Sequence, residues 1–273
     1  MEDKVKKYLL YLFNILIGLL IISPILYGVS VSLMTPDELF SYPPKLLPSS
    51  FNLANYKQVM ATVPIFKFIF NSFYVSLAVT IGQIITSCLA AYAFSYFDFR
   101  GKKLLFILSL STLMIPSEST IISNYLTVAK LGWTDTYTGL IVPFLVSAMG
   151  VFQIRQFYLT VPKELKEAST LDGCSNFKFF IKVLLPISKP VISSLGVYTF
   201  LNTWNQYMWP LLVTNAPEKR TVQIGISMLQ FAESQNIGIV FAGVIMIILP
   251  SIVVFIVGQK QLVKGITSGA VKG

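Results

Sequence analysis

The sequence predicts an all-α membrane protein with six transmembrane helices. Of its residues, 54% are hydrophobic and 12% are charged, against roughly 25% charged residues in ordinary soluble domains. The apolar residues also form six stretches long enough to cross a bilayer, with polar segments between them. The chain contains no histidine, the commonest general base, and its two cysteines indicate no disulfide or metal framework. This composition disfavours an enzyme.

The N-terminal stretch is predicted to be a retained membrane span. Lys4, Lys6 and Lys7 precede an apolar run from Tyr8 to about Met34. A cleaved signal peptide would have an apolar core of only about 7 to 15 residues, so a retained helix is favoured. The residues that follow, 35–62, are rich in proline, serine and asparagine. We expect them to form an extramembrane loop with one short amphipathic helix.

The second span is expected over residues 65–96, where small residues allow close helix packing in lipid. Within it we interpret Gln83 as an interhelical hydrogen-bonding group rather than a substrate ligand.

After the basic turn FDFRGKK, the third span is expected over 104–125 and contains Pro116. An ionisable residue in a span is a candidate functional group. Glu118 lies about 22 Å along this span, however, so an interfacial or structural role is favoured over substrate contact.

The remaining spans are expected over residues 137–154, 191–213 and 238–258, and six spans place both termini on the same side. Fifteen of the 21 lysines and arginines lie on that side, so the positive-inside rule predicts cytoplasmic termini. The same asymmetry explains the net charge of +9 without nucleic acid. We expect three parts: the first helix with its loop (1–64), a five-helix core (65–261) and a cytoplasmic tail (262–273).

A polar segment, residues 160–190, separates the fourth and fifth spans and faces the cytoplasm in this topology. Pro162 favours the first turn of a helix, and Glu164 and Glu167 complement its positive end. We expect this short helix to run to about Asp172.

Gly173 supplies the permissive backbone that ends such a helix. Ser175 is then expected to cap a second helical segment, which Pro186 bends or ends. The prediction is two short helices joined at a glycine.

One face of the first short helix is made by small or short side chains. A solvated connector lying on the membrane is the ordinary interpretation of a charged loop. A ridge of small residues, however, suits docking into a partner's groove better than burial in lipid. The residues of this face are Leu165, Ala168, Ser169 and Asp172.

The same loop resembles the signature of bacterial ABC importer permeases: EAA, three residues, G, nine residues and I-x-L-P. Glu167, Ala168 and Ser169 take the EAA positions, Gly173 follows after three residues, and VLLP, ending at Pro186, follows after nine more. Serine replaces the second alanine and valine the isoleucine. The segments VAKLGWTDTYTGLIVPF, RQFYLTVPKEL, NTWNQYMWPLL and GITSGAVKG extend the resemblance to the carbohydrate-uptake branch, in particular the shorter of its two paired membrane subunits.

The resemblance implies a type I ABC importer permease fold in the bacterial inner membrane, with a cytoplasmic coupling helix between the fourth and fifth spans. It also implies several partners: a second related permease, two ATPase subunits and an extracytoplasmic solute-binding protein. The chain has no Gly-x-x-x-x-Gly-Lys-Ser/Thr loop, so ATP and magnesium are expected on the ATPase subunits and no cofactor on this chain. The residues implied in ATPase coupling are Glu164, Glu167, Ala168, Ser169, Asp172, Gly173 and Pro186.

Amide and aromatic side chains crowd the fifth span, where Asn202, Trp204, Asn205 and Tyr207 fall within six residues. They suit a neutral polyol such as a sugar, because amides hydrogen-bond hydroxyls and aromatic faces stack on rings. An interfacial aromatic belt is an equal alternative for this cluster. With Glu118, these residues are the candidates for the substrate path.

The expected substrate is a neutral mono- or oligosaccharide. A phosphate group favours a cationic contact, and the interiors of spans four to six contain no lysine or arginine. The alternative within the branch is glycerol 3-phosphate, because NQYMWPLL also resembles its permeases. A stand-alone secondary transporter is a second alternative, but such a carrier usually places ionisable groups near the midplane, and only Glu118 comes close.

Overall fold

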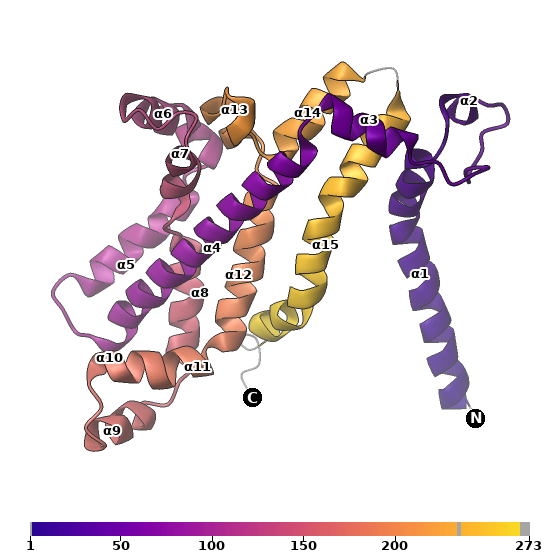
Figure 1. Cartoon of the computed structure of the whole chain (residues 1–273). Helices are drawn as coiled ribbons and strands as arrows, with labels where there is room; N and C mark the ends of the chain where they lie inside the picture. The colour runs from indigo at the N-terminus through magenta and orange to yellow at the C-terminus, as the bar shows by residue number, and fades with distance from the viewer. Residues whose placement is uncertain (1, 234–235, 268–273) are drawn as a thin grey trace. The chain divides into compact units, whose positions relative to one another are not determined.

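The computed structural model describes residues 2–233 and 236–267, which form helices, tight helical turns and loops. The chain forms two compact units, drawn together in Figure 1. Unit 1 contains residues 1–66 and 225–249, and unit 2 contains residues 67–224 and 250–273. The division expected at residue 64 lies next to the boundary between the units, and residues 225–249 join the first unit.

Three helices are long and apolar enough to cross a membrane alone, and three bent pairs bring the candidate spans among the described residues to as many as six. The sequence predicts this number. The single helices are α1 (Glu2–Ser32), α4 (Ile65–Tyr96) and α15 (Ile237–Thr267). The last continues nine residues beyond the predicted end at 258, and residues 268–273 of the predicted tail lie outside the described residues.

The prediction of one continuous third span over 104–125 is wrong. The chain forms α5 (Lys102–Ser111) and a 3-10 turn, η1 (Thr112–Met114), and then bends by 101° into α6 (Ser117–Lys130). Pro116 explains the break, because proline lacks a backbone N–H and drives the preceding residue into extended backbone. Ile115 has φ −86° and ψ 116°.

The predicted fifth span, 191–213, is also interrupted. Helix α12 (Lys189–Trp204) ends at Asn205, and a separate helix, α13 (Met208–Val213), follows. Pro210 lies in the first turn of α13, where a missing N–H costs nothing, so the helix must restart just before it. The fourth span is a pair bent by 43°, made of α7 (Tyr137–Ile141) with η2 (Val142–Phe144) and α8 (Ala148–Tyr158).

Unit 2 has a hydrophobic core at each end. At one end, which we call the loop-side core, the end of α4 and the end of α8 pack against the segment that precedes α12 (Figure 1). At the other end, the far-side core joins α4 to α6, α7 and α13. A 3-10 turn, η4 (Pro217–Lys219), leads from α13 to α14 (Val222–Ala232). Asn71 of α4 fixes this connection by donating to the carbonyls of Glu218 and Arg220, at 2.9 and 2.8 Å.

Unit 1 holds the loop expected over 35–62. It contains the predicted short helix, α3 (Ala54–Thr62), and an additional turn, α2 (Pro36–Leu39). Asn55 ties the loop to the end of α1 by donating to the carbonyls of Ser32 and Met34, at 3.0 and 2.9 Å. Hydrogen bonds from Ser49 and from the backbone of Thr35 lower the pKa of the Glu38 carboxyl to about 2.

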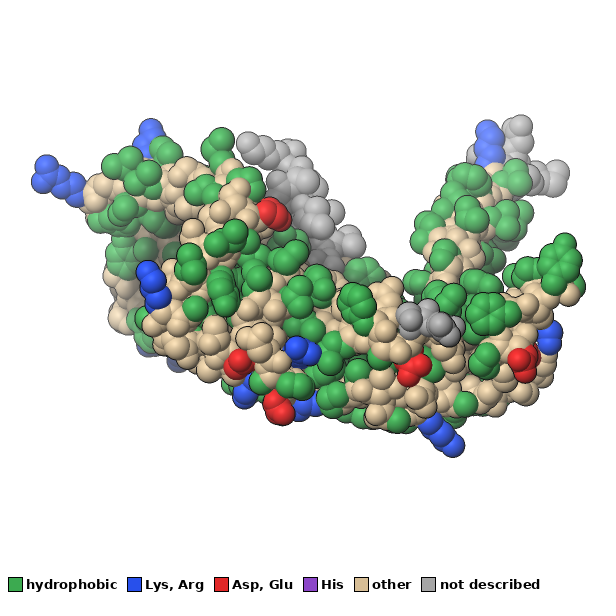
Figure 2. Space-filling model, turned by 90° about the horizontal axis from the view of Figure 1, so that it is seen from above, with side chains coloured by type: hydrophobic (Ala, Val, Ile, Leu, Met, Phe, Trp, Pro, Cys, Tyr) green, Lys and Arg blue, Asp and Glu red, His purple; other side chains and the backbone are tan. Residues whose placement is uncertain are grey.

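Exposed apolar side chains are widespread over the described surface. Figure 2 shows the molecule from above, and on this face hydrophobic side chains cover more of the surface than charged ones. On α1, Leu20 and Ile21 are 72% and 69% exposed. Surfaces of this kind are covered in the native setting by lipid acyl chains or by partner proteins.

We predict that Gln83→Leu destabilises the helical core. Gln83 Nε2 donates to the carbonyl of Phe144 at 2.8 Å, and Thr199 Oγ1 donates to Gln83 Oε1 at 3.0 Å, as the interpretation of this residue anticipated. Interhelical bonds in membranes contribute about 1 kcal/mol each. Thermal unfolding of the purified chain in detergent should therefore show a lower midpoint, whereas Gln156→Leu at an exposed site leaves it unchanged. An unaltered midpoint in Gln83→Leu would contradict the assignment.

Candidate functional site

The polar segment 160–190 forms two short helical parts joined at a glycine, as predicted. The first is α9 (Glu164–Leu171), with Glu164 and Glu167 in its first turn. Its C-terminus is closed by two backbone hydrogen bonds, from Gly173 N to Thr170 O at 3.0 Å and from Cys174 N to Ser169 O at 2.9 Å. This pair of bonds is the Schellman arrangement. It requires the left-handed backbone that Gly173 adopts, with φ +72°.

The second part begins at Ser175, which caps α10 (Asn176–Phe179) by accepting a hydrogen bond from Lys178 N at 3.3 Å. A π-helical turn, η3 (Phe180–Leu184), and one turn of α-helix, α11 (Leu185–Ile187), follow. The chain then bends by 74° into α12. Pro186 explains why regular α-helical bonding fails here, because it lacks the N–H that would continue the ladder.

The second part of the segment is anchored in the loop-side core. Phe179, Phe180 and Leu184 are buried there. The ring of Phe180 lies 4.9 Å from that of Tyr92, and Phe179 contacts Tyr96 edge to face at 5.5 Å. The hydroxyl of Tyr92 also donates to the carbonyl of Asn176 at 2.9 Å. Residues 176–187 are therefore packed against α4 and α8 as part of the same core.

Helix α9 is held more lightly. Ser169 is its one residue buried from solvent, and Lys166 joins it to α10. The Lys166 ammonium donates to Asn176 Oδ1 at 2.5 Å and lies 4.7 Å from the centroid of the Phe179 ring. Sequence reasoning missed this contact, because nothing in the sequence pairs a lysine with an amide ten residues later.

The outer face of α9 is exposed. Glu164, Glu167, Ala168 and Asp172 lie on the surface, as docking residues must. Ser169 was grouped with them by spacing, but it turns inward and is 7% exposed. Leu171 was not singled out from the sequence, yet it is 90% exposed at the C-terminal end of the helix. A single exposed leucine is common on protein surfaces, so Leu171 adds to this face only together with the carboxylates beside it.

The candidate substrate residues divide between surface and interior. Asn202 and Asn205 are exposed on α12 and at its C-terminal end, and Tyr207 is 37% exposed. Trp204, in contrast, is 1% exposed and stacks on Phe200, with centroids 5.8 Å apart. Trp204 is therefore part of the interior of unit 2.

Tyr198 lies on the same face of α12 as Asn202 and Asn205, and we call this surface the exposed amide face. Tyr198 is 58% exposed and precedes Asn202 by four residues and Asn205 by seven, so the three side chains share one face of α12. The spacing alone could have identified it. Asn205 Nδ2 donates to the carbonyl of Leu201 at 2.8 Å, and its Oδ1 accepts from Gln223 Nε2 at 3.4 Å. An exposed amide at Asn202 that faced hydrocarbon would lose hydrogen bonds to water, so this face is suited to a water-filled path or to a partner.

Glu118 lies apart from the α12 face. It is exposed in the first turn of α6, just beyond the 101° bend, and its Oε1 accepts a hydrogen bond from Ser117 Oγ at 3.1 Å. Helix α6 packs into the far-side core through Val128, Ile121 and Tyr125. The interfacial role of Glu118 stays a prediction.

Comparisons with known proteins identify relatives over nearly the whole chain. Residues 53–264 match the family model of the binding-protein-dependent transport system inner membrane component. The sn-glycerol-3-phosphate transport system permease protein UgpE of Agrobacterium fabrum is 37% identical over 92% of this chain and 93% of its own. The arabinooligosaccharides transport system permease protein AraQ of Bacillus subtilis is 33% identical over 100% of this chain and 98% of its own.

The fold also matches a solved structure. A chain of a bacterial ABC transporter involved in the import of the acidic polysaccharide alginate superposes with a TM-score of 0.83, at 22% identity, over 95% of this chain and 97% of that chain. This similarity supports the predicted permease fold independently of close sequence identity.

We predict that Lys166→Met loosens α9 from α10. The substitution removes the bond to Asn176 and the cation over Phe179, a loss of about 1 kcal/mol. Hydrogen exchange at the amide of Cys174, which closes α9, should become about fivefold faster. Lys163→Met, at an exposed lysine just before α9, is the matched control and should leave exchange unchanged. Equal exchange in both variants would show that the contact does not restrain the helix.

Proposed function

The chain belongs to the family of binding-protein-dependent transport system inner membrane components, and on that premise we propose how its parts perform import. It is a permease subunit of an ABC importer and not a catalytic subunit. We propose that α9 is the coupling helix that docks on a separate ATPase, and that α12 presents the face along which substrate passes. The closed turn at Gly173, packed on the membrane helices through α10, is the observation that carries the first assignment.

The proposed docking surface combines charge with one apolar projection. Glu164, Glu167 and Asp172 offer carboxylates for charge-assisted hydrogen bonds to a partner. Leu171 offers an apolar side chain that is 90% exposed before docking, and its burial in a groove contributes about 1.5 to 3 kcal/mol. No atom lies within 4 Å of the position where a Cβ of residue 173 would stand, so its φ of +72°, rather than crowding, is what favours glycine there.

Movement of α9 reaches the membrane helices through the loop-side core. Its Schellman turn connects it directly to α10 and η3, where Phe179 and Phe180 are buried among tyrosines of α4 and α8. The α10–α11 segment then joins α12 through a single bend of 74°. A displacement imposed by ATPase closure is thus delivered to the helix that carries Asn202 and Asn205, which is the switching step of alternating access.

Four kinds of partner complete the proposed importer: a second related permease, a pair of ATPase subunits, an extracytoplasmic solute-binding protein and the lipid bilayer. The chain then supplies half of the translocation path. ATP and magnesium belong to the ATPase subunits. We place α9 in the cytoplasm, because Lys102, Lys103 and Arg155 lie at the same end of unit 2 as α9, as the positive-inside rule expects. The cytoplasmic placement of both termini rests on the distribution of lysine and arginine along the sequence.

The proposed substrate is a neutral mono- or oligosaccharide. Asn202, Asn205 and Tyr198 present amide and phenol groups, which hydrogen-bond sugar hydroxyls without demanding a charge on the substrate. The interiors of spans four to six contain no lysine or arginine that could balance a phosphate. The relative AraQ carries an oligosaccharide in its name, and the similarity to it extends over the whole of this chain.

Glycerol 3-phosphate is the second candidate. The relatives named for its transport are 35–37% identical to this chain. For this substrate, cationic recognition would have to come from the partner permease or the binding protein.

We predict that Gly173→Val uncouples transport from ATP hydrolysis. Valine at φ +72° strains the turn by about 1 to 2 kcal/mol, which lowers the population of the docked turn by about tenfold. Uptake by the complete importer in proteoliposomes should fall accordingly, while membrane insertion and ATPase activity persist. Gly173→Asn is the control, because asparagine tolerates left-handed backbone. Normal uptake by Gly173→Val would argue against the coupling role.

We predict that Asn202→Leu lowers uptake of a labelled oligosaccharide by about tenfold, since one lost polar contact costs about 1 to 3 kcal/mol. The complex should still assemble, and Asn124→Leu on exposed α6 should transport normally. The measurement uses the cognate binding protein with either the oligosaccharide or glycerol 3-phosphate. Uptake of the phosphate ester without the sugar would overturn the substrate assignment and leave the coupling role intact.

A further inference from the structure

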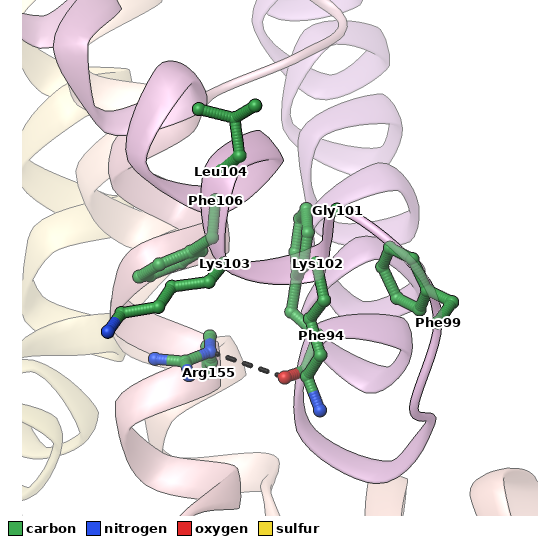
Figure 3. Close-up of a pocket in the computed structure, with 8 residues that line it drawn as sticks. All are labelled: Phe94, Phe99, Gly101, Lys102, Lys103, Leu104, Phe106 and Arg155. Carbon is green, nitrogen blue, oxygen red and sulfur yellow. Dashed lines mark hydrogen bonds between the residues drawn. The ribbon is translucent and has the colours of Figure 1, made fainter.

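A basic hollow of about 520 Å³ lies at the turn between α4 and α5, away from the exposed amide face of α12. Figure 3 shows its lining. The walls come from the end of α4, the start of α5 and the side of α8. They combine three aromatic rings with three cations: Phe94, Phe99, Phe106, Lys102, Lys103 and Arg155, together with Gly101 and Leu104.

Two of the three cations are available for an outside ligand. Lys102 is occupied by the turn itself, because it donates to the carbonyl of Phe97 at 2.7 Å and to Asp98 at 3.3 Å. Lys103 is exposed and has no hydrogen-bond or ion-pair partner among the described residues. It is therefore a free cation at the rim of the hollow.

Arg155 is fixed in place beside it. Its Nε donates to the carbonyl of Phe94 at 3.4 Å, and its guanidinium lies 4.1 Å from the centroid of the Phe106 ring. In Figure 3 the cationic ends of Lys103 and Arg155 point the same way. None of the eight lining residues is acidic, so an anion in the hollow would meet these two positive charges and no carboxylate of the lining.

The surroundings identify the kind of anion. The hollow lies where a membrane-spanning helix, α4, ends and the next apolar helix, α5, begins, which is the depth of lipid headgroups. Beside it, Leu104, Leu105 and Ile107 of α5 are 62%, 50% and 53% exposed. A ligand with a phosphate at the cations and acyl chains along this apolar face satisfies both surfaces.

We propose that this hollow binds the phosphate of an anionic phospholipid such as phosphatidylglycerol. Arg155 supplies a flat, pre-oriented pair of donors and Lys103 a mobile point charge, which is how the two residue types recognise phosphate. The acyl chains lie along α5. The binding itself does not depend on the proposed coupling role; only the assignment to the cytoplasmic leaflet rests on the proposed orientation.

The test uses the assembled importer in vesicles that contain photoactivatable phosphatidylglycerol or, as the neutral counterpart, photoactivatable phosphatidylcholine. Cross-linked peptides that cover 94–106 and 148–158 are quantified by mass spectrometry. Phosphatidylglycerol should label them more than phosphatidylcholine does. Lys103→Gln should lower the phosphatidylglycerol labelling about fivefold, because one basic residue at the surface contributes that much. Lys189→Gln, which removes an exposed charge elsewhere, should not lower it.

Four further results test the proposal. Arg155→Lys, which keeps the charge and loses the guanidinium plane, should give intermediate labelling. Excess inorganic phosphate should leave the labelling unchanged; displacement would identify a site for soluble anions and overturn the proposal. Equal labelling by both lipids would also overturn it. So would labelling that occurs in the isolated chain and is abolished by the partner subunits, because the hollow would then be a protein interface.

Discussion

Burial of Phe179 and Phe180 among the tyrosines of α4 and α8 is the contact on which the working parts of unit 2 depend. Each buried aromatic side chain contributes about 1.5 to 3 kcal/mol, so the pair holds the segment before α12 more strongly than single polar contacts hold α9. The bond from Lys166 to Asn176 contributes about 1 kcal/mol. These magnitudes separate a firmly packed segment, 176–187, from the lightly attached helix α9, which closes on itself through Gly173. In the proposed coupling, a helix so attached adapts to the groove of the ATPase, and the packed segment transmits its displacement.

Local chemistry made the loop and most spans predictable. Pro162, Glu164, Gly173 and Ser175 act within a few residues of their own backbone, so the sequence specifies both short helices and the turn between them. Pro116 is a local signal for a break in the third span, but it was not used in the sequence analysis. The size of that break, 101°, depends on the packing of α6 into the far-side core, which no local rule contains.

Burial was harder to predict than helix position. In a membrane protein both the lipid-facing and the protein-facing sides of a helix are apolar, so periodicity does not distinguish them. For that reason Trp204 was grouped with the exposed amides in the sequence analysis, although Trp204 lies in the interior. Tyr198, which shares the face of Asn202 and Asn205, was overlooked there. The contact between Lys166 and Phe179 is set by the three-dimensional path of the turn, and likewise has no signature in the sequence.

Helix α8 connects the two sites at this end of unit 2. Arg155 and Tyr158 are three residues apart, so their side chains are neighbours on the surface of the helix. The first lies over Phe106 in the basic hollow, and the second is 1% exposed in the loop-side core. Six residues after Tyr158 the chain enters α9. An anion that neutralises Arg155 and Lys103 therefore acts on the same rigid helix that supports the base of the docking loop. Since both contacts lie in the last turn of one helix, the proposed lipid would restrain the element against which α9 moves in the proposed coupling.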